Sequence, residues 1–254
     1  MEYGVQIYTL RNELTNISGV QDAFRYIKSI GIDKVELAAM PKAADIDIKK
    51  AAMDAGIAIV STHSDFRDIR KHMPELIRSH FVYGADIIGI GGMPGKYRRS
   101  LKAVSKFVEI FNRAADEAAR YGMKLCYHNH AFEFETLSGI VLFDYLLEHL
   151  NRNVVFCVDC YWADYAGQEV VPLLEKVGDR LALMHFKDST GREKGGKMCA
   201  LGTGVLNFAD YIAAGERLGA RCALIELDES RDPRADIRTS AQYLKQLNKG
   251  EASC

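Results

Sequence analysis

Short apolar runs that end in a polar residue recur along this chain. The clearest is Val154-Val-Phe-Cys-Val-Asp159, and similar runs lead into His185, into Glu226 and into the pair His128 and His130. Strands that are apolar throughout are buried on both faces, which is typical of a parallel sheet covered by helices. A charged group at the end of such a strand is costly unless a partner compensates it. The pattern therefore predicts a parallel sheet whose strand ends carry the chemistry.

Eight such strands alternate with eight stretches of helical periodicity. The strands are expected at 4–8, 34–38, 58–63, 86–91, 124–130, 154–159, 181–187 and 223–228. The helices are expected at 19–30, 44–55, 68–83, 100–121, 140–150, 169–178, 207–218 and 234–247. Gly31, Gly56, Gly122 and Gly219 mark helix ends. This order predicts an α/β fold, a single-domain (β/α)8 TIM barrel over residues 1–254.

A doubly wound sheet is the alternative fold. It would usually place a glycine-rich turn after the first strand, and Tyr8-Thr-Leu-Arg-Asn-Glu13 contains no glycine. The longest irregular segment, about 188–206, is a candidate lid, because uncommonly long loops in compact domains often have this role.

Side-chain parity adds a test within the strands, because barrel-facing positions recur every second residue. The polar residues of each strand share a parity: Gln6 with Tyr8, Ser61 with His63, His128 with His130, Cys157 with Asp159, His185 with Lys187, and Glu226 with Asp228. Glu36 is the polar residue of the second strand. These side chains can all face one cavity at the carboxyl-terminal mouth, where barrel active sites lie.

Charge and composition narrow the class of partner. The 254 residues include 33 basic and 34 acidic side chains, a net charge of -1, so we expect neither a nucleic-acid nor a membrane partner. The N-terminus lacks a basic region followed by an apolar one, so no signal peptide is expected. The six cysteines are expected to be small buried residues of a cytoplasmic protein. The sequence is compatible with a monomer and with a homo-oligomer.

Three consecutive strands bring Asp159, His185 and Glu226 to one end of the barrel. Carboxylates mixed with one imidazole suit Mn²⁺, Co²⁺, Mg²⁺ or Zn²⁺. The fourth ligand should come from the fifth strand. His128 has the right parity, whereas Glu133 lies beyond the strand end, so the residues alone leave both open.

Such a site suggests proton abstraction from a carbohydrate. The metal would polarise a carbonyl and stabilise the enediolate that forms, while a carboxylate acts as general base. Glu133 and Glu226 are the candidate bases. Lys187 could hold a substrate hydroxyl or the enediolate oxygen, or it could form an ion pair with Asp188 or Glu226. His63 could contact substrate or be structural.

Five motifs resemble the sugar phosphate isomerase/epimerase family, the xylose-isomerase-like barrels that include ketose 3-epimerases and inosose dehydratases. They are Tyr127-His-Asn-His-Ala-Phe-Glu-Phe134, Val158-Asp-Cys-Tyr-Trp162, His185-Phe-Lys-Asp188, Leu201-Gly-Thr-Gly204 and Ile225-Glu-Leu-Asp228. The resemblance implies one divalent ion held by Glu133, Asp159, His185 and Glu226. It implies that His128 and His130 then support the site or contact substrate, and we expect further substrate contacts from Gln6, Glu36, His63, Trp162 and Asp228.

The leading hypothesis is thus a metal-dependent isomerase or epimerase of a small-molecule sugar, keto-sugar or cyclic polyol. A lyase that loses a β-hydroxyl after the same proton abstraction is the alternative. An abasic-site endonuclease would need a multinuclear zinc cluster with extra histidines and a basic face, and here the third residue after Asp159 is Trp162. A catalytically silent sugar-binding barrel is the remaining class. Arg98 and Arg99, or Arg192 and Lys194, could meet a phosphate, although solvated surface charge is the favoured interpretation.

Overall fold

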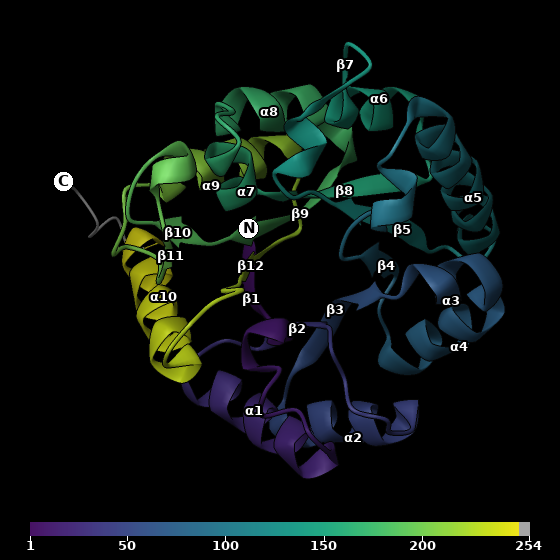
Figure 1. Cartoon of the computed structure of the whole chain (residues 1–254). Coiled ribbons are helices and arrows are strands. Elements are labelled where there is room, and N and C mark those ends of the chain that lie inside the picture. The colour runs from purple at the N-terminus through teal and green to yellow at the C-terminus, as the bar shows by residue number, and fades with distance from the viewer. Residues whose placement is uncertain (249–254) are drawn as a thin grey trace.

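Eight parallel strands close into a barrel in the computed structural model, which describes residues 1–248. The strands lie in the middle of the molecule and the helices form a ring around them (Figure 1). The barrel strands are β1 (Glu2–Gln6), β2 (Lys34–Leu37), β3 (Ala58–Ser64), β4 (Ile87–Ile90), β5 (Lys124–His128), β8 (Val154–Asp159), β9 (Leu181–Phe186) and β12 (Cys222–Ile225). Their order around the barrel is β1-β12-β9-β8-β5-β4-β3-β2. The predicted TIM barrel is confirmed, and residues 249–254 of the predicted domain lie outside the described residues.

The surrounding helices are α1 (Ile17–Ser29), α2 (Asp45–Ala55), α3 (Phe66–Lys71), α4 (Met73–Tyr83), α5 (Leu101–Ala119), α6 (Leu142–His149), α7 (Cys160–Tyr165), α8 (Val170–Val177), α9 (Phe208–Leu218) and α10 (Pro233–Asn248). Two short hairpins interrupt this pattern. One pairs β6 (Thr136–Leu137) with β7 (Ile140–Val141), and the other pairs β10 (Asp188–Ser189) with β11 (Met198–Cys199). No helix among residues 1–248 is long and apolar enough to cross a membrane.

Local chemistry explains where the elements end. The four glycines predicted to end helices all have positive φ, between 66° at Gly56 and 89° at Gly31, which L side chains disfavour. The helix predicted over 68–83 is wrong in one respect, because it divides at His72 into α3 and α4. Pro74 stands in the first turn of α4, where it lacks the N–H that a continuous helix would need.

Three predicted strands end two or more residues earlier than expected, and the one predicted over 223–228 ends at Ile225, before Glu226 and Asp228. The strand predicted over 4–8 ends at Gln6, whose side chain accepts a hydrogen bond from the Tyr8 amide and so begins a 3-10 turn at Ile7–Leu10. The strand predicted over 124–130 ends at His128. The chain therefore turns at the barrel mouth sooner than the apolar pattern indicates.

The barrel interior is built in layers. Cys126, Cys157, Leu183 and Leu224 belong to one buried apolar cluster inside the barrel. Two residues further along the same four strands, and therefore on the same face, stand the polar groups of the candidate site. A larger apolar core packs between the strands and the helices. Cys126, Cys157, Cys160 and Cys222 are buried free thiols as predicted, Cys199 is half-buried, and Cys254 lies outside the described residues.

Candidate active site

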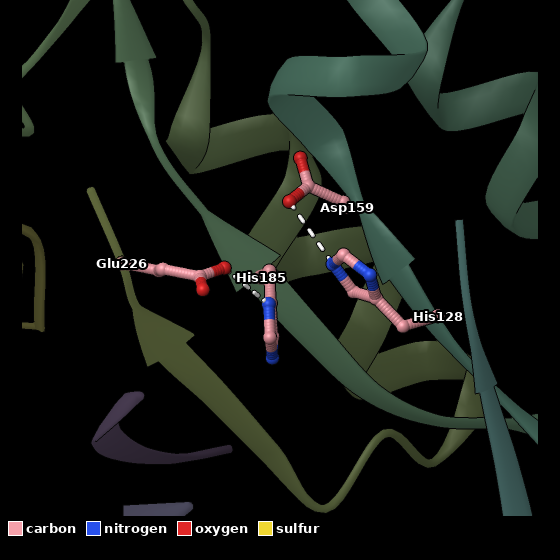
Figure 2. Close-up of side chains that lie close together, drawn as sticks. All are labelled: His128, Asp159, His185 and Glu226. Atoms are coloured by element: carbon pink, nitrogen blue, oxygen red, sulfur yellow. Dashed lines mark hydrogen bonds and ion pairs between the residues drawn. The ribbon is translucent and has the colours of Figure 1, made fainter. Parts of the chain in front are cut away.

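Four buried side chains meet at the carboxyl-terminal end of the barrel. His128 ends β5, Asp159 ends β8, His185 lies in β9, and Glu226 directly follows β12. One ligand atom from each lies within 4.8 Å of the others, the arrangement needed to hold a metal ion. Figure 2 shows these side chains pointing toward one another from their separate strands. Strand register brings them together, since Asp159 stands opposite His185 in the β8–β9 pair.

Hydrogen bonds fix the orientation of these groups. His128 Nε2 lies 3.2 Å from Asp159 Oδ2, and His185 Nδ1 lies 2.7 Å from Glu226 Oε2. The other oxygen of Asp159, Oδ1, accepts the Trp162 amide at 2.8 Å and so caps α7. Asn129 accepts a hydrogen bond from the Asp159 amide at 3.0 Å. Hydrogen bonds to neighbouring residues therefore hold the carboxylates of Asp159 and Glu226 in place.

Lys187 lies between the carboxylates. Its ammonium is 2.9 Å from Asp159 Oδ2, 2.8 Å from Glu226 Oε2 and 2.8 Å from Asp228 Oδ2, and the side chain is only 1% exposed. Of the ion pairs considered from the sequence, the structure forms the one with Glu226. Asp188 has a different role.

Glu36 connects the site to the other half of the barrel. Its Oε2 accepts from Gln6 Nε2 at 2.5 Å and lies 2.7 Å from His185 Nε2 and 3.3 Å from His63 Nε2. Glu36, His63 and His185 form a second group whose ligand atoms lie within 4.8 Å of one another. An added Cβ at Gly89 would lie 3.2 Å from His63 Cδ2 and 2.4 Å from the Thr62 carbonyl oxygen, so glycine there leaves room for the imidazole.

The electrostatic environment determines which of these groups are charged and which are neutral. Burial raises the pKa of Glu226, but Lys187 and His185 outweigh it and hold the value well below its usual range. Burial, together with His185 and His63, holds the pKa of His128 well below its usual range. Burial also lowers the pKa of Lys187, but Asp159, Glu226 and Asp228 hold it well above. Glu226 is therefore ionised, Lys187 is charged, and His128 is neutral.

Burial and neighbouring charges also shift the pKa values of His185 and Asp228. Burial lowers the pKa of His185, but Cys157, Glu226 and Glu36 outweigh it and raise the value. His185 is therefore an imidazolium that donates to carboxylates from both ring nitrogens. Burial raises the pKa of Asp228, against the opposing effect of Lys187.

Glu133 lies apart from the four convergent groups. Its Oε1 accepts the Tyr127 hydroxyl at 2.7 Å, and its Oε2 accepts the His130 amide at 2.8 Å. The side chain is fully buried, and burial raises its pKa to about 8 against these two donors. The structure thus brings His128 rather than Glu133 into the four-residue group.

A cavity of about 680 Å³ opens above the site. The predicted site residues that line it are His63, His128, His130, Trp162, Glu226 and Asp228. Gln6, Glu36, Asp159, His185 and Lys187 lie buried beneath it, each 0–1% exposed. Sequence reasoning missed Ala38, Ala39, Ser64, Asp65 and Gly91 in this lining. Ser64 ends β3, and the other four lie just after strands, where irregular segments carry no periodic signal.

Asp188 holds the long segment that follows β9. Its Oδ1 accepts the amides of Ser189 at 2.7 Å and Leu206 at 3.1 Å, and its Oδ2 accepts those of Gly202 and Gly204, both at 2.9 Å. An added Cβ at Gly204 would lie 2.3 Å from Asp188 Oδ1, so only glycine permits this approach. No residue of 188–206 lines the cavity above Glu226, whereas Thr190, Gly196 and Thr203 of this segment line a neighbouring cavity.

The Xylose isomerase-like TIM barrel family model matches residues 24–247. The chain belongs to this family. A segment of 83 residues is 39% identical to the inosose dehydratase of Geobacillus kaustophilus, and this segment spans 32% of the chain but only 26% of that relative's length.

Two solved structures share the fold of this xylose isomerase-like barrel over nearly their whole length. A sugar phosphate isomerase/epimerase from Parabacteroides distasonis is 24% identical, with a TM-score of 0.80 and coverage of 96% of this chain and 98% of that one. A D-allulose 3-epimerase from Methylomonas sp. in complex with D-allulose is 17% identical, with a TM-score of 0.74 and 97% coverage of both chains.

The donor set suits a divalent ion. Two carboxylates and two imidazoles offer mixed oxygen and nitrogen ligands, and His128 Nδ1 is buried with no hydrogen-bond partner among the described residues. Within residues 1–248, the carboxyl groups of Glu36, Asp159, Glu226 and Asp228 face two cationic groups, His185 and Lys187. An excess of negative charge therefore remains, and His185 would have to lose a proton to act as a ligand.

Proposed function

We propose that this barrel is a divalent-metal-dependent isomerase or epimerase of a sugar, keto-sugar or cyclic polyol. The observation that carries the proposal is the convergence of His128, Asp159, His185 and Glu226, all within 4.8 Å, at the base of a cavity large enough for a small ligand. Membership of the xylose isomerase-like family and the fold shared with a D-allulose 3-epimerase support a sugar substrate.

We assign the ion to His128, Asp159, His185 and Glu226, with His128 in place of Glu133. Glu133 would have to leave two hydrogen bonds to reach these groups, whereas His128 already contacts Asp159. The ion, when bound, supplies a Lewis acid that polarises a substrate carbonyl and makes the neighbouring C–H more acidic. Mixed ligands of this kind suit Mn²⁺, Co²⁺, Mg²⁺ or Zn²⁺.

Glu226 is the proposed general base. His185 and Lys187 both contact its Oε2, so we assign the other oxygen, Oε1, to the substrate proton. Its lowered pKa keeps it ionised, and it lines the cavity. Asp228, whose pKa is raised, is the proposed second proton carrier on the same side. Lys187 contacts both carboxylates and positions them.

The remaining cavity groups are suited to recognising a polyhydroxylated ring. His63 and His130 offer ring nitrogens to substrate hydroxyls, and Trp162 offers an aromatic surface. Gln6 and Glu36 lie beneath the cavity and orient His63 and His185 rather than contact the substrate directly.

Solvent exchange tests the proposal. The Mn²⁺-loaded protein is incubated in deuterated buffer with D-allulose, D-fructose and a keto-inositol, and incorporation of deuterium is followed by NMR. We expect incorporation next to the carbonyl, and Glu226→Gln should slow it by about 10²–10⁴-fold because a general base is lost. Glu109→Gln, an exposed position on α5, is the matched control. Undiminished exchange in Glu226→Gln would contradict the assignment of the base.

A dehydratase that uses the same site is the second candidate. The 39% identity of one segment to an inosose dehydratase favours it, and so does Asp228, because loss of a β-hydroxyl needs a group that can donate a proton. The two reactions share the first proton abstraction. Mass spectrometry separates them, since only the dehydratase yields a product lighter by one water.

A further inference from the structure

A second cavity adjoins the one above Glu226. It measures about 940 Å³, and Trp162 and Asp228 line both cavities. The two residues are joined by a hydrogen bond of 3.2 Å from Trp162 Nε1 to Asp228 Oδ2. They therefore form a shared edge, with the proposed chemistry on one side of it and an unassigned space on the other. Each cavity alone falls in the range of about 300–1,000 Å³ typical of small-molecule sites.

One wall of the second cavity is aromatic. Tyr161, Trp162 and Tyr165 all come from α7, the short helix that Asp159 caps, and all three line the cavity. Their rings support one another, with centroids 5.0 Å apart for Tyr161 and Trp162 and 5.4 Å apart for Trp162 and Tyr165. Rigid aromatic side chains give a large contact area at low conformational cost.

The rest of the lining mixes polar side chains with the apolar Met198, Cys199 and Ala200. Thr190 and Thr203 come from the segment that Asp188 anchors, and Arg231, Asp236 and Thr239 come from the start of α10 and the turn before it. Aromatic rings and hydroxyl, guanidinium and carboxylate groups in one cavity match a ring that has an apolar face and many hydroxyls. A second sugar unit has this chemistry.

We propose that the second cavity binds a further sugar unit of the substrate, so that the enzyme acts on a glycosylated keto-sugar rather than a free monosaccharide. The reacting ring lies above Glu226 and the attached sugar passes the Trp162–Asp228 edge onto the α7 aromatic residues. This inference rests on the proposed function, and it adds the substrate class. Binding energy from the remote sugar then contributes to catalysis at the reacting ring.

Deuterium exchange with matched ketoses tests the substrate class. The probes are D-fructose and three disaccharides in which D-fructose carries a glycosyl group on O3, O4 or O6, each tested with the Mn²⁺-loaded full chain. We expect kcat/KM for at least one disaccharide to exceed that for D-fructose by about tenfold or more. Equal or lower values for all three disaccharides would overturn the proposal.

Variants of the second cavity localise the effect. Tyr165→Ala and Arg231→Ala change residues that line only this cavity, so each should lower kcat/KM for the preferred disaccharide several-fold more than that for D-fructose. Lys71→Ala, at a residue that lines neither of these two cavities, is the control and should change neither value. Equal losses on both substrates would contradict a second-sugar site.

A measurement of sugar binding distinguishes failure of this inference from failure of the proposed function. If no sugar exchanges deuterium, the isomerase proposal fails, and saturation-transfer NMR with the same four sugars still tests the cavity. Disaccharide binding that weakens in Tyr165→Ala supports the second site without any turnover. Absence of disaccharide binding, or binding that Tyr165→Ala leaves unchanged, would overturn it.

Discussion

At the scale of single residues, Lys187 shows how a charge is kept inside this barrel. A buried ammonium is costly by itself, and here it contacts Asp159, Glu226 and Asp228 at 2.8–2.9 Å. The same three contacts offset the electrostatic repulsion among these carboxylates. Parity alone placed Lys187 on the cavity side, but its distance from each carboxylate depends on how far β9 projects beyond β8 and β12.

Removal of this ammonium should destabilise the metal-free protein. Lys187→Met leaves three carboxyl groups facing one another, and loss of one partner of a buried pair costs about 3–5 kcal/mol. Added Mn²⁺ should restore more stability to the variant than to the wild type, because it replaces the missing charge. Urea unfolding with and without Mn²⁺ measures both effects.

The control for Lys187→Met is Lys176→Met. Lys176 pairs with Asp144 on the surface, where both side chains are about half exposed, so its loss should cost about 0–1 kcal/mol. A cost for Lys187→Met no larger than this would show that the buried network does not need the ammonium.

Glu133 should make stability depend on pH. Its pKa is raised to about 8 in the folded chain from 4.5, so the folded state holds a proton that the unfolded state releases between these values. The stabilisation is complete below about pH 4.5 and is lost as pH rises toward 8. Glu133→Gln removes this dependence. In chelator, its advantage in unfolding free energy over the wild type should therefore grow from pH 4.5 to 8.

The exposed neighbour Glu135 supplies the control for this profile. Glu135→Gln should leave the shape of the stability curve unchanged. Parallel curves for Glu133→Gln and the wild type across the same range would mean that Glu133 is ionised in the folded protein at neutral pH.

At the scale of elements, the segment after β9 is organised by one carboxylate rather than by periodic structure. Asp188 accepts the backbone amides of Ser189, Gly202, Gly204 and Leu206, and the hairpin of β10 and β11 lies between these points. The segment thus lines the second cavity from a fixed position. Its sequence shows the glycines but not the residue that they approach.

Asp188→Asn should loosen this segment. The amide would place an N–H group against backbone donors, and each hydrogen bond to a charged group contributes about 1.5–3 kcal/mol. Trypsin should then cleave after Arg192, Lys194 or Lys197 faster than in the wild type, which mass spectrometry would detect. Asp54→Asn, an exposed position on α2, is the control. Equal cleavage rates would contradict the anchoring role.

At the scale of the whole molecule, folding of the barrel and binding of the proposed ion are coupled. The four proposed ligands lie in or directly after separate strands, so the unfolded chain cannot present them together and ion binding should stabilise only the folded state. At a hundredfold excess over Kd the gain is about 2.7 kcal/mol, which corresponds to a rise in Tm of about 5–10 °C for a chain of this size.

Calorimetry with Mn²⁺ and then with chelator measures this rise and its reversal. Asp159→Asn should abolish the shift, whereas Asp179→Asn, at an exposed surface ion pair, should retain it. A Tm that Mn²⁺ leaves unchanged in the wild type would contradict the metal site, although the second cavity would remain testable by sugar binding.

The sequence by itself determined the barrel and most of the residues at its mouth. Apolar runs with period-two parity, separated by helical periodicity and glycine helix ends, specify buried parallel strands, and parity assigned Asp159, His185 and Glu226 to one face. What only the tertiary structure decided are relations between strands and turns: His128 rather than Glu133 in the four-residue group, Lys187 among three carboxylates, and α7 after Asp159. Periodicity reports which face a residue occupies, whereas register, strand length and the path of each turn set the distances between side chains from different strands.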